Sequence, residues 1–491
     1  MTNLRRALVS AAALGVATFA VALAGAAPAV STPVDVTNDV YANNEESLGM
    51  DPSGRLLAGA WNDWEFNDGC GFSYSTDGGD HWARESFVPG MTNFTNDPDV
   101  EPLVPSIYAI AGDPSVAYNP SSHKFDVICQ AFGTKTGNQI QLMATTFDPA
   151  LADPNADENE SYGAAAWRLP ASPVAAGVTP SQQRGQNGHF PDHESITVDT
   201  GTGGNHHFGR LYVTWAEFNG SQRAPINLSY SDDDGSTWTG PILVSDKENK
   251  FDQDARPSVG PDGTVYVSWV NAPTNGNFKG HVVMIDKSTD GGAHWGVDQV
   301  AAEIQFPVAG TLPNSGYRVF DDAWSTVDQV SGKVVVVYND KTSAAGPSNI
   351  YATHNLSAGN ISGANWAAAA RVKPVAQEQF FPWISSAPNG RVDLVFYDRS
   401  CDPAGDMLNC VTLASTSDSG TTWTTASLLS TGFDGDKYSA CLAFGDPLAC
   451  GRKFLGDYIA VASTNAKAQA LWTGNGPAGM DVFSGRAVFG P

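Results

Sequence analysis

The chain has 491 residues, with 52 acidic side chains against 27 basic ones and a formal net charge of −25 at pH 7. Only 16% of the residues are charged, whereas glycine (50), proline (30) and tryptophan (13) are abundant. This surplus of negative charge opposes binding to nucleic acids and to anionic membranes, so neither is an expected partner. The composition is typical of a turn-rich, all-β protein.

The beginning of the chain predicts a secretory signal peptide at residues 1–29. The basic pair Arg5-Arg6 precedes an apolar run, Ala7–Leu23, and small residues follow at Ala24–Ala26 and at Ala27–Ala29, either of which can hold the cleavage site. A basic, an apolar and a small-residue region in this order are typical of secretion signals. No second apolar stretch follows, so we expect a secreted, extracellular protein without membrane insertion after cleavage.

A two-strand pattern recurs along residues 30–491 and predicts a single repeat domain. Each copy has an alternating stretch, a turn of the Pro-x-Gly type and a strand that ends in an aromatic residue or cysteine, which indicates a β-hairpin. The seven copies are Ser47–Trp61, Ser115–Cys129, Ser195–Trp215, Ser258–Trp269, Ser325–Tyr338, Ser385–Tyr397 and Tyr458–Trp472.

Four of these units continue into one turn sequence of the form S/T-x-D-x-G-x-x-W. An aspartate in a tight turn accepts hydrogen bonds from backbone N–H groups two or more residues on, and glycine supplies the positive φ of the turn. The tryptophan begins the next strand and is expected to pack over the turn. The four segments are Ser75–Trp82, Ser231–Trp238, Ser288–Trp295 and Thr416–Trp423.

These segments resemble the Asp-box, or BNR repeat, of sialidases and related secreted bacterial propellers. The resemblance implies a β-propeller with the box between the third and fourth strands of a blade, away from the active site. Seven units predict an all-β, seven-bladed β-propeller, and the six-bladed sialidase propeller is the alternative. The expected blades lie near 44–90, 112–170, 192–246, 254–305, 320–373, 380–430 and 455–491.

The last unit lacks a fourth strand. Residues 34–41 alternate weakly in polarity and precede the first unit. We expect them to supply the missing outer strand and to close the ring, because closure protects sheet edges that would otherwise be unpaired.

The six cysteines are an even number, as expected of a disulfide framework in a secreted chain. Cys401 and Cys410 are nine residues apart, as are Cys441 and Cys450. If each of these two close pairs forms a disulfide, Cys70 and Cys129 remain as the third pair. We predict these three disulfides from the short spacing alone. No cysteine or histidine spacing indicates a zinc site.

Acidic residues precede the predicted innermost strand of every unit except the sixth. Such connections gather around the central channel on one face of a propeller, where converging carboxylates raise one another's pKa or bind a cation. We expect Asp254, Asp322 and Asp457 to hold a cation, with calcium (Ca2+) as the candidate and no cofactor required. The alternative is that the acids bind backbone N–H groups where strands begin. The acids are Glu45, Glu46, Asp113, Asp192, Glu194, Asp254, Asp321, Asp322 and Asp457.

The resemblance also implies roles for single residues. Sialidases hold the substrate carboxylate with three arginines, and they use an aspartate as acid/base and a glutamate-activated tyrosine as nucleophile. By position, this implies substrate binding by Arg256, Arg318 and Arg452. Independently of the resemblance, Trp383 lies in a loop-like position where its ring can stack on a sugar, with packing between blades as the alternative. The resemblance further implies catalysis by Asp113, Glu194, Tyr438 and Tyr458. Structural ion pairs between the arginines and neighbouring acids are the alternative, and the Arg-Ile-Pro-type motif of many sialidases is absent.

We therefore predict a secreted, glycan-directed propeller that acts as an exo-acting glycoside hydrolase of the sialidase type. Its partner is expected to be a glycan or glycoconjugate substrate, and the protein is expected to be a monomer. The first alternative is a non-catalytic propeller that binds carbohydrate or protein, with cations stabilising the axial acids. The second is a propeller polysaccharide lyase that acts at a uronate.

Overall fold

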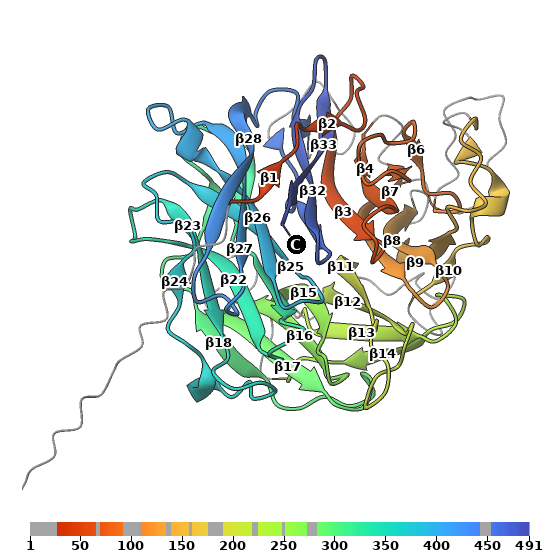
Figure 1. Ribbon diagram of the computed structural model, residues 1–491, viewed down its shortest axis with the longest axis horizontal. Coiled ribbons are helices and arrows are strands. Elements are labelled where there is room, and N and C mark those ends of the chain that lie inside the picture. Colours follow the sequence, from red (N-terminus) through yellow and green to blue (C-terminus); the bar gives the residue numbers. More distant parts are fainter. Residues whose placement is uncertain are drawn as a thin grey trace, which may run out of the picture.

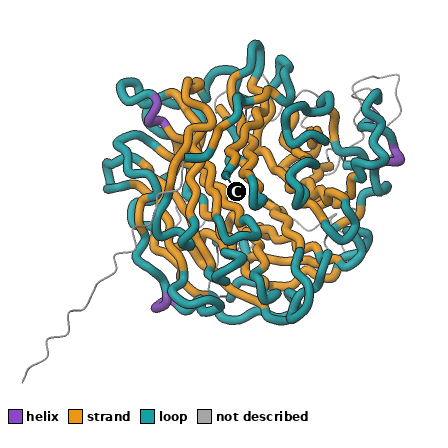
Figure 2. The backbone as a smooth tube through the Cα atoms, viewed as in Figure 1, coloured by secondary structure: helices purple, strands orange, loops and turns teal. Residues whose placement is uncertain are grey.

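The computed structural model describes residues 27–64, 69–91, 108, 110–133, 139–156, 160–174, 190–218, 224–247, 251–272, 282–441 and 453–490. Seven antiparallel sheets stand around a central axis and form a β-propeller (Figure 1). Strands dominate the described chain, and helix is limited to short 3-10 turns at its periphery (Figure 2). The prediction of seven blades is confirmed, and the six-bladed alternative is wrong.

Blades 1 to 4 each contain four strands in sequence order, with the first strand innermost. Blade 1 consists of β3 (Asn43–Met50), β4 (Leu57–Asp63), β5 (Gly69–Ser75) and β6 (Ser86–Phe87). Blade 2 consists of β7 (Ile110–Asn119), β8 (Lys124–Gly133), β9 (Gln139–Phe147) and β10 (Ser172–Pro173). Blade 3 consists of β11 (Phe190–Val198), β12 (Leu211–Phe218), β13 (Ile226–Ser231) and β14 (Thr239–Leu243). Blade 4 consists of β15 (Asp252–Val259), β16 (Val265–Asn271), β17 (Val282–Ser288) and β18 (Gln299–Glu303).

Blades 5 and 6 repeat this order, and two small hairpins lie outside the blades. Blade 5 consists of β21 (Ala323–Val327), β22 (Val334–Lys341), β23 (Ser348–His354) and β24 (Ala370–Arg371). Blade 6 consists of β25 (Gln379–Ser386), β26 (Val392–Asp398), β27 (Leu408–Thr416) and β28 (Thr424–Asp434). The hairpins are β19 (Ala309–Thr311) with β20 (Arg318–Phe320) and β29 (Ala440–Cys441) with β30 (Lys453–Phe454).

Blade 7 joins the two ends of the described chain. Its inner strands are β31 (Ala460–Ser463), β32 (Lys467–Asn475) and β33 (Met480–Val488). The outer positions are filled by β1 (Ala29–Val30) and β2 (Val34–Asp35), which both pair with β33. The expected closure by an N-terminal strand is thus confirmed. The remainder of the predicted signal peptide, residues 1–26, lies outside the described residues.

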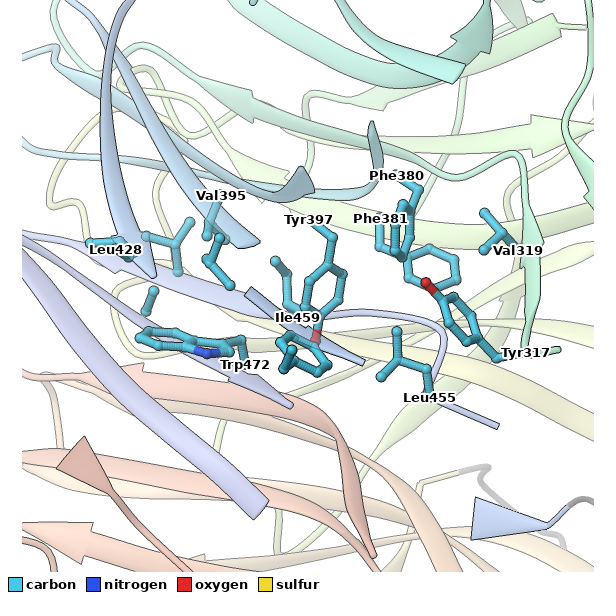
Figure 3. Close-up of a cluster of buried hydrophobic side chains, with 14 of the residues drawn as sticks. Tyr317, Val319, Phe380, Phe381, Val395, Tyr397, Leu428, Leu455, Ile459 and Trp472 are labelled. Atoms are coloured by element: carbon cyan, nitrogen blue, oxygen red, sulfur yellow. The ribbon is translucent and has the colours of Figure 1, made fainter. Parts of the chain in front are cut away.

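The core consists of apolar side chains packed between neighbouring blades. The second strands are buried on both faces, as in β22 and β26, and their sequences are accordingly near-continuous apolar runs. The largest cluster lies between blades 6 and 7 and includes Tyr397, Phe380 and Trp472 (Figure 3). The face-to-face packing of neighbouring blades holds the innermost strands at fixed positions around the axis.

The four S/T-x-D-x-G-x-x-W segments form one and the same turn between the third and fourth strands of blades 1, 3, 4 and 6. In blade 3 the N–H of Gly235 donates to Ser231 Oγ at 3.0 Å, and the N–H of Thr237 donates to Asp233 Oδ1 at 2.8 Å. The indole of Trp238 donates to the carbonyl of Gly235 at 3.0 Å. The other three turns repeat the first two bonds, and those of blades 4 and 6 repeat the third.

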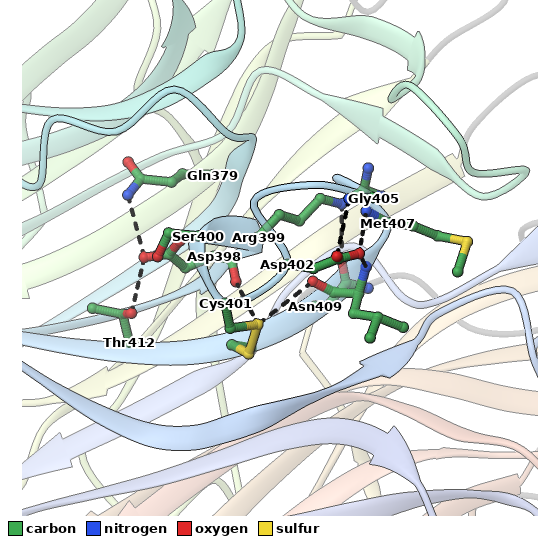
Figure 4. Close-up of a disulfide and its surroundings, with 12 residues drawn as sticks. Gln379, Asp398, Arg399, Ser400, Cys401, Asp402, Gly405, Met407, Asn409 and Thr412 are labelled. Atoms are coloured by element: carbon green, nitrogen blue, oxygen red, sulfur yellow. Dashed lines mark hydrogen bonds between the residues drawn. A yellow bond between two sulfur atoms is a disulfide. The ribbon is translucent and has the colours of Figure 1, made fainter.

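Two of the three predicted disulfides are present in the described residues. Cys70 of β5 bonds to Cys129 of β8 and so links blades 1 and 2. Cys401 bonds to Cys410 and closes the loop between β26 and β27, in which Asp402 accepts backbone hydrogen bonds (Figure 4). The third predicted pair, Cys441–Cys450, lies outside the described side chains. No helix in the described ranges is long and apolar enough to cross a membrane.

Candidate active site

Five innermost strands share an irregularity close to their first residues. At that point two residues of the innermost strand lie opposite one residue of the second strand, which is a β-bulge. Bulges re-aim side chains and are frequent beside active sites, and a positive φ in a residue other than glycine stores strain of about 1–3 kcal/mol. The residues with positive φ are Glu45 (62°), Asp113 (49°), His193 (53°), Asp254 (59°) and Phe381 (50°).

The bulges bring acidic side chains from different blades into contact at the axis. We call this group the axial acid cluster. Most of its members are buried, whereas Asp113 and Asp192 are partly exposed. The cluster consists of Glu45, Asp113, Asp192, His193, Glu194, Asp254, Asp322 and Asp457.

His193 lies at the centre of the cluster and is only 6% exposed. Its Nδ1 forms an ion pair with Asp254 Oδ1 at 2.5 Å, and its Nε2 lies 3.8 Å from Asp457 Oδ2. Burial disfavours the charged imidazolium, but the carboxylates of Asp254, Asp192 and Asp457 outweigh burial and raise the pKa of His193 well above its ordinary value. The imidazolium of His193, which belongs to blade 3, thus links the carboxylates of Asp254 and Asp457. Sequence reasoning did not select His193 as an active-site residue.

Arg318, on β20, holds Asp457 with a two-pronged hydrogen bond. Its Nε donates to Asp457 Oδ1 at 2.9 Å, and its Nη2 donates to Asp457 Oδ2. The backbone N–H of Asp457 donates in turn to Glu45 Oε1 at 3.0 Å. Both prongs of the Arg318 guanidinium are therefore engaged by a carboxylate of the protein itself, as the ion-pair alternative expects.

A second polar chain joins blades 1 and 2. Asn62 Nδ2 donates to Glu45 Oε2 at 2.5 Å, and Asn62 Oδ1 accepts from the N–H of Asp113 at 2.7 Å. Asn62 thus fixes the bulges of both blades with one amide. Sequence reasoning missed Asn62, because its partners lie in other strands.

Arg256 occupies an aromatic site rather than an ion pair. It is 2% exposed, and its guanidinium carbon lies 3.7 Å above the ring of Trp324. The rings of Trp383 and Tyr458 lie 5.8 Å from the same carbon. Trp324 is itself held by a 3.1 Å hydrogen bond from its indole to Asp322 Oδ2. The geometry indicates a cation–π stack at the base of the cluster.

Burial and mutual repulsion raise the pKa values of several carboxyl groups in the cluster. Burial, together with neighbouring acids, raises the pKa of Asp192 to about 7 and that of Asp322 to about 7. Burial first and the charge of Asp113 second raise the pKa values of Glu45 and Glu194 well above their ordinary range. A carboxyl group with a pKa near 7 can both give and take a proton at neutral pH.

The structure places most of the predicted site residues in or against this cluster. Asp113, Glu194, Asp254, Asp322 and Asp457 belong to it. Arg256, Arg318, Tyr458 and Trp383 contact it or the aromatic stack beneath it.

Tyr438 and Arg452 stand apart from this arrangement. Tyr438 follows β28, is 39% exposed and has the Lys437 ammonium 4.4 Å from its ring centroid. No contact joins it to the cluster in the described part of the chain. Arg452 lies outside the described residues.

The expected cation site gains no support from the side-chain positions. Asp254 pairs with His193, Asp457 binds Arg318, and Asp322 accepts from Trp324. Among the residues that the structure describes, no group of three or more His, Cys, Asp or Glu side chains is placed to hold a metal ion.

No family model and no curated protein matches the chain. Solved structures do match it. A protein of unknown function from Dyadobacter fermentans is 14% identical at a TM-score of 0.47 and covers 79% of this chain and 98% of its own. The intramolecular trans-sialidase of Ruminococcus gnavus is 15% identical at a TM-score of 0.42, with 75% and 92% covered. A polysaccharide lyase, an ulvan lyase, is 11% identical at a TM-score of 0.48, with 94% of both chains covered.

Proposed function

We propose that the protein is a glycan-directed glycoside hydrolase whose active site is the axial acid cluster, with Asp192 and Asp113 as the reacting carboxyl groups. The observation that carries the proposal is that these two acids are the partly exposed carboxyls of a cluster that is otherwise buried. Glycoside hydrolases use two carboxyl groups, of which one has a raised pKa and acts as the general acid.

The environments of the two acids suggest their roles. Burial raises the pKa of Asp192 to about 7, so a protonated Asp192 can deliver its proton to the oxygen of the leaving group. Asp113 is one of the negative charges that act on Asp192, and as a carboxylate it can activate water or attack the sugar. After the bond is cleaved, the proton returns to Asp192 from water.

His193 and Arg318 support this arrangement as positioning residues. The imidazolium of His193 binds Asp254 and approaches Asp457, which Arg318 holds from the other side. Two cations thus offset carboxylates that would otherwise repel one another behind the reacting pair. Their role in the proposal is to keep the buried charges balanced while Asp192 changes its protonation.

The sialidase-type version of the proposal has less support than a neutral or N-acetylated sugar substrate. Arg318 already binds Asp457 through Nε and Nη2, and Arg256 is buried against Trp324, so a substrate carboxylate would compete with contacts that the protein itself makes to both. Burial and the charges of Glu45, Asp113 and Glu194 raise the pKa of Tyr458 well above its ordinary value, which opposes a phenolate nucleophile. An acidic mouth also repels an anionic sugar.

The test is hydrolysis of a panel of 4-methylumbelliferyl glycosides, comprising neutral hexosides, N-acetylhexosaminides, glucuronides and sialosides. We expect turnover of a neutral or N-acetylated substrate, with activity that falls as the pH rises through about 7, because Asp192 then loses its proton. Asp192→Asn and Asp113→Asn should each lower kcat/KM by roughly 10²–10⁴-fold. Glu303→Gln, an exposed acid on outer strand β18, is the matched control and should leave kcat/KM unchanged.

Three results would contradict the proposal. Absence of turnover on every glycoside would favour the non-catalytic binding propeller. Release of an unsaturated uronide from a polysaccharide would favour the lyase. Turnover that both Asn variants retain would place the active site elsewhere.

A further inference from the structure

A cavity of about 630 Å³ lies on the axis, at the face that carries the turns between the first and second strands of the blades. Its volume is in the range of small-molecule sites. All seven innermost strands line this cavity. Their lining residues lie C-terminal to the bulges at the axial acid cluster. The cavity and the cluster therefore occupy opposite ends of the same axis. We call this space the axial cavity.

Hydroxyl groups line the wall of the axial cavity on every side of the axis. Every blade contributes at least one serine, and Ser258 of blade 4 and Ser325 of blade 5 have buried hydroxyls without a hydrogen-bond partner in the described part of the chain. Ser258 is 8% exposed and Ser325 is 5% exposed, and their strands are neighbours. A buried hydroxyl without a partner is costly, so these two groups favour a ligand with hydroxyls of its own. The lining serines are Ser47, Ser115, Ser195, Ser258, Ser325, Ser385, Ser386 and Ser463.

An aromatic surface forms part of the same wall. Trp383 is partly exposed, and its ring packs against that of Trp324 with centroids 3.5 Å apart and planes tilted by 33°. Arg256 holds Trp324 in place from the side of the acid cluster, at 3.7 Å. The exposed atoms of Trp383 thus belong to a ring that has little freedom to move. Such a rigid, flat, apolar surface suits the C–H face of a sugar ring.

The wall of the cavity offers no unpaired charge. The ionisable side chains along it are Asp51, Asp199 and His206. Asp51 accepts hydrogen bonds from the backbone of Arg55 and Leu56 at 2.8 Å each. Asp199 pairs with His206 at 2.7 Å. An anionic ligand would therefore find no free counter-ion on this wall, whereas an uncharged ligand needs none.

We propose that the axial cavity is a second binding site, which takes an uncharged sugar ring through stacking on Trp383 and hydrogen bonds to Ser258 and Ser325. The site shares no reacting group with the axial acid cluster, and its existence does not depend on hydrolysis at that cluster. A glycan-directed protein would gain from it a second point of attachment to its substrate or to a surface that carries it.

The test is calorimetric titration of the whole secreted protein with glucose, galactose, mannose, lactose and glucuronic acid. At least one neutral sugar should bind, and glucuronic acid should bind at least about tenfold more weakly than that sugar. Thr197→Trp fills the cavity from a partly exposed position of β11, and Ser386→Trp does so from β25. Each should weaken the binding by about tenfold or more. Thr425→Trp on the outer strand β28 is the matched control and should bind as the unaltered chain does.

The other outcomes separate this proposal from the proposed function. Asp192→Asn should lower kcat/KM by roughly 10²–10⁴-fold and leave sugar binding intact. The proposal is overturned if no neutral sugar binds, if both tryptophan variants are folded by near-ultraviolet circular dichroism and still bind, or if Asp192→Asn alone removes the binding. Binding that persists in a protein without any hydrolytic activity would support the cavity and contradict the hydrolase.

Discussion

At the scale of single residues, several carboxyl groups are buried without an ion-pair partner in the described part of the chain. Outside the axis, burial raises the pKa of Asp126 to about 7, and likewise those of Asp252 and Asp286. One oxygen of each is buried without a hydrogen-bond partner in the described ranges. These groups fold as neutral acids, because an unpaired buried carboxylate is far more costly than a protonated one.

The first prediction concerns pH and Asp126. The folded chain holds this proton up to about pH 7, whereas the unfolded chain releases it near the ordinary aspartate pKa of 3.8. The folded state thus binds more protons in this window, and the free energy of unfolding should fall as the pH rises from 5 to about 7. In Asp126→Asn, which keeps the acceptor for Thr146, the difference in stability between pH 5 and pH 8 should shrink by about 2 kcal/mol.

Chemical denaturation at the two pH values measures this effect. Asp77 and Asp290 provide the contrast, because backbone and side-chain hydrogen bonds overcome their partial burial and lower their pKa values to about 2. Their stabilising contribution is complete above the ordinary pKa and is lost only as the pH falls through about 2. Asp290→Asn should therefore leave the difference between pH 5 and pH 8 unchanged. An unchanged difference in Asp126→Asn would show that its proton is not linked to folding.

At the scale of elements, the turns and the bulges of a blade have different roles. The S/T-x-D-x-G-x-x-W turns join the third and fourth strands and satisfy their own polar groups within a few residues. The bulges of the innermost strands do the opposite, since they send side chains such as His193 and Asp254 to partners in other blades. The turns stabilise the blade, and the bulges build the site.

The turn of blade 3 yields an element-scale prediction. Asp233 accepts from the N–H and the hydroxyl of Thr237 and from Ser231 Oγ, at 2.7–2.8 Å. Asp233→Ala should lower the free energy of unfolding by about 1–2 kcal/mol, as for the loss of a capping side chain. Asp233→Asn keeps an acceptor and should lose less. Both variants should keep the kcat/KM of the unaltered protein, and a lower kcat/KM would show that the turn acts on the site.

At the scale of the whole molecule, the ring is closed where the N-terminal segment meets blade 7. Val36 is 7% exposed and packs with Trp61 and Leu471, which belong to blades 1 and 7. At the axis, the hydrogen bond from Asp457 to Glu45 spans the same junction. Closure therefore protects the edge of β33 and also holds two members of the axial acid cluster together.

Val36 and Val40 form a matched pair that tests this closure. Val36→Asp buries an unpaired carboxylate and should destabilise the protein by about 3 kcal/mol, whereas Val40, which is 64% exposed, should tolerate the same change within about 0.5 kcal/mol. Denaturation measures the loss, and size-exclusion chromatography should show association of Val36→Asp through its freed sheet edge. Equal stability of the two variants would mean that the N-terminal segment does not hold the ring.

Features that arise within one repeat were predictable from the sequence. Hairpin periodicity and turn chemistry act over a few residues, and they sufficed for the seven-bladed fold and the closing strand. The disulfide Cys401–Cys410 followed from its short spacing, and Cys70–Cys129 followed as the remaining pair. Most of the residues expected at the axis do lie there, because every innermost strand begins at the same face. Tyr438 is the exception, because it follows the outer strand β28 and lies beside Lys437 rather than at the axis.

The sequence by itself thus determined a closed ring of blades with an acidic axis, since each blade encodes its own strands and turns. The tertiary structure alone decided which charges meet. Arg318 and Asp457 are 139 residues apart and Glu45 and Asp457 are 412 apart, yet the closed ring makes both pairs neighbours. Whether an arginine is free for a substrate or bound by the protein depends on such contacts, and no local pattern records them. The same holds for the axial cavity, whose wall exists only when all seven strands stand side by side.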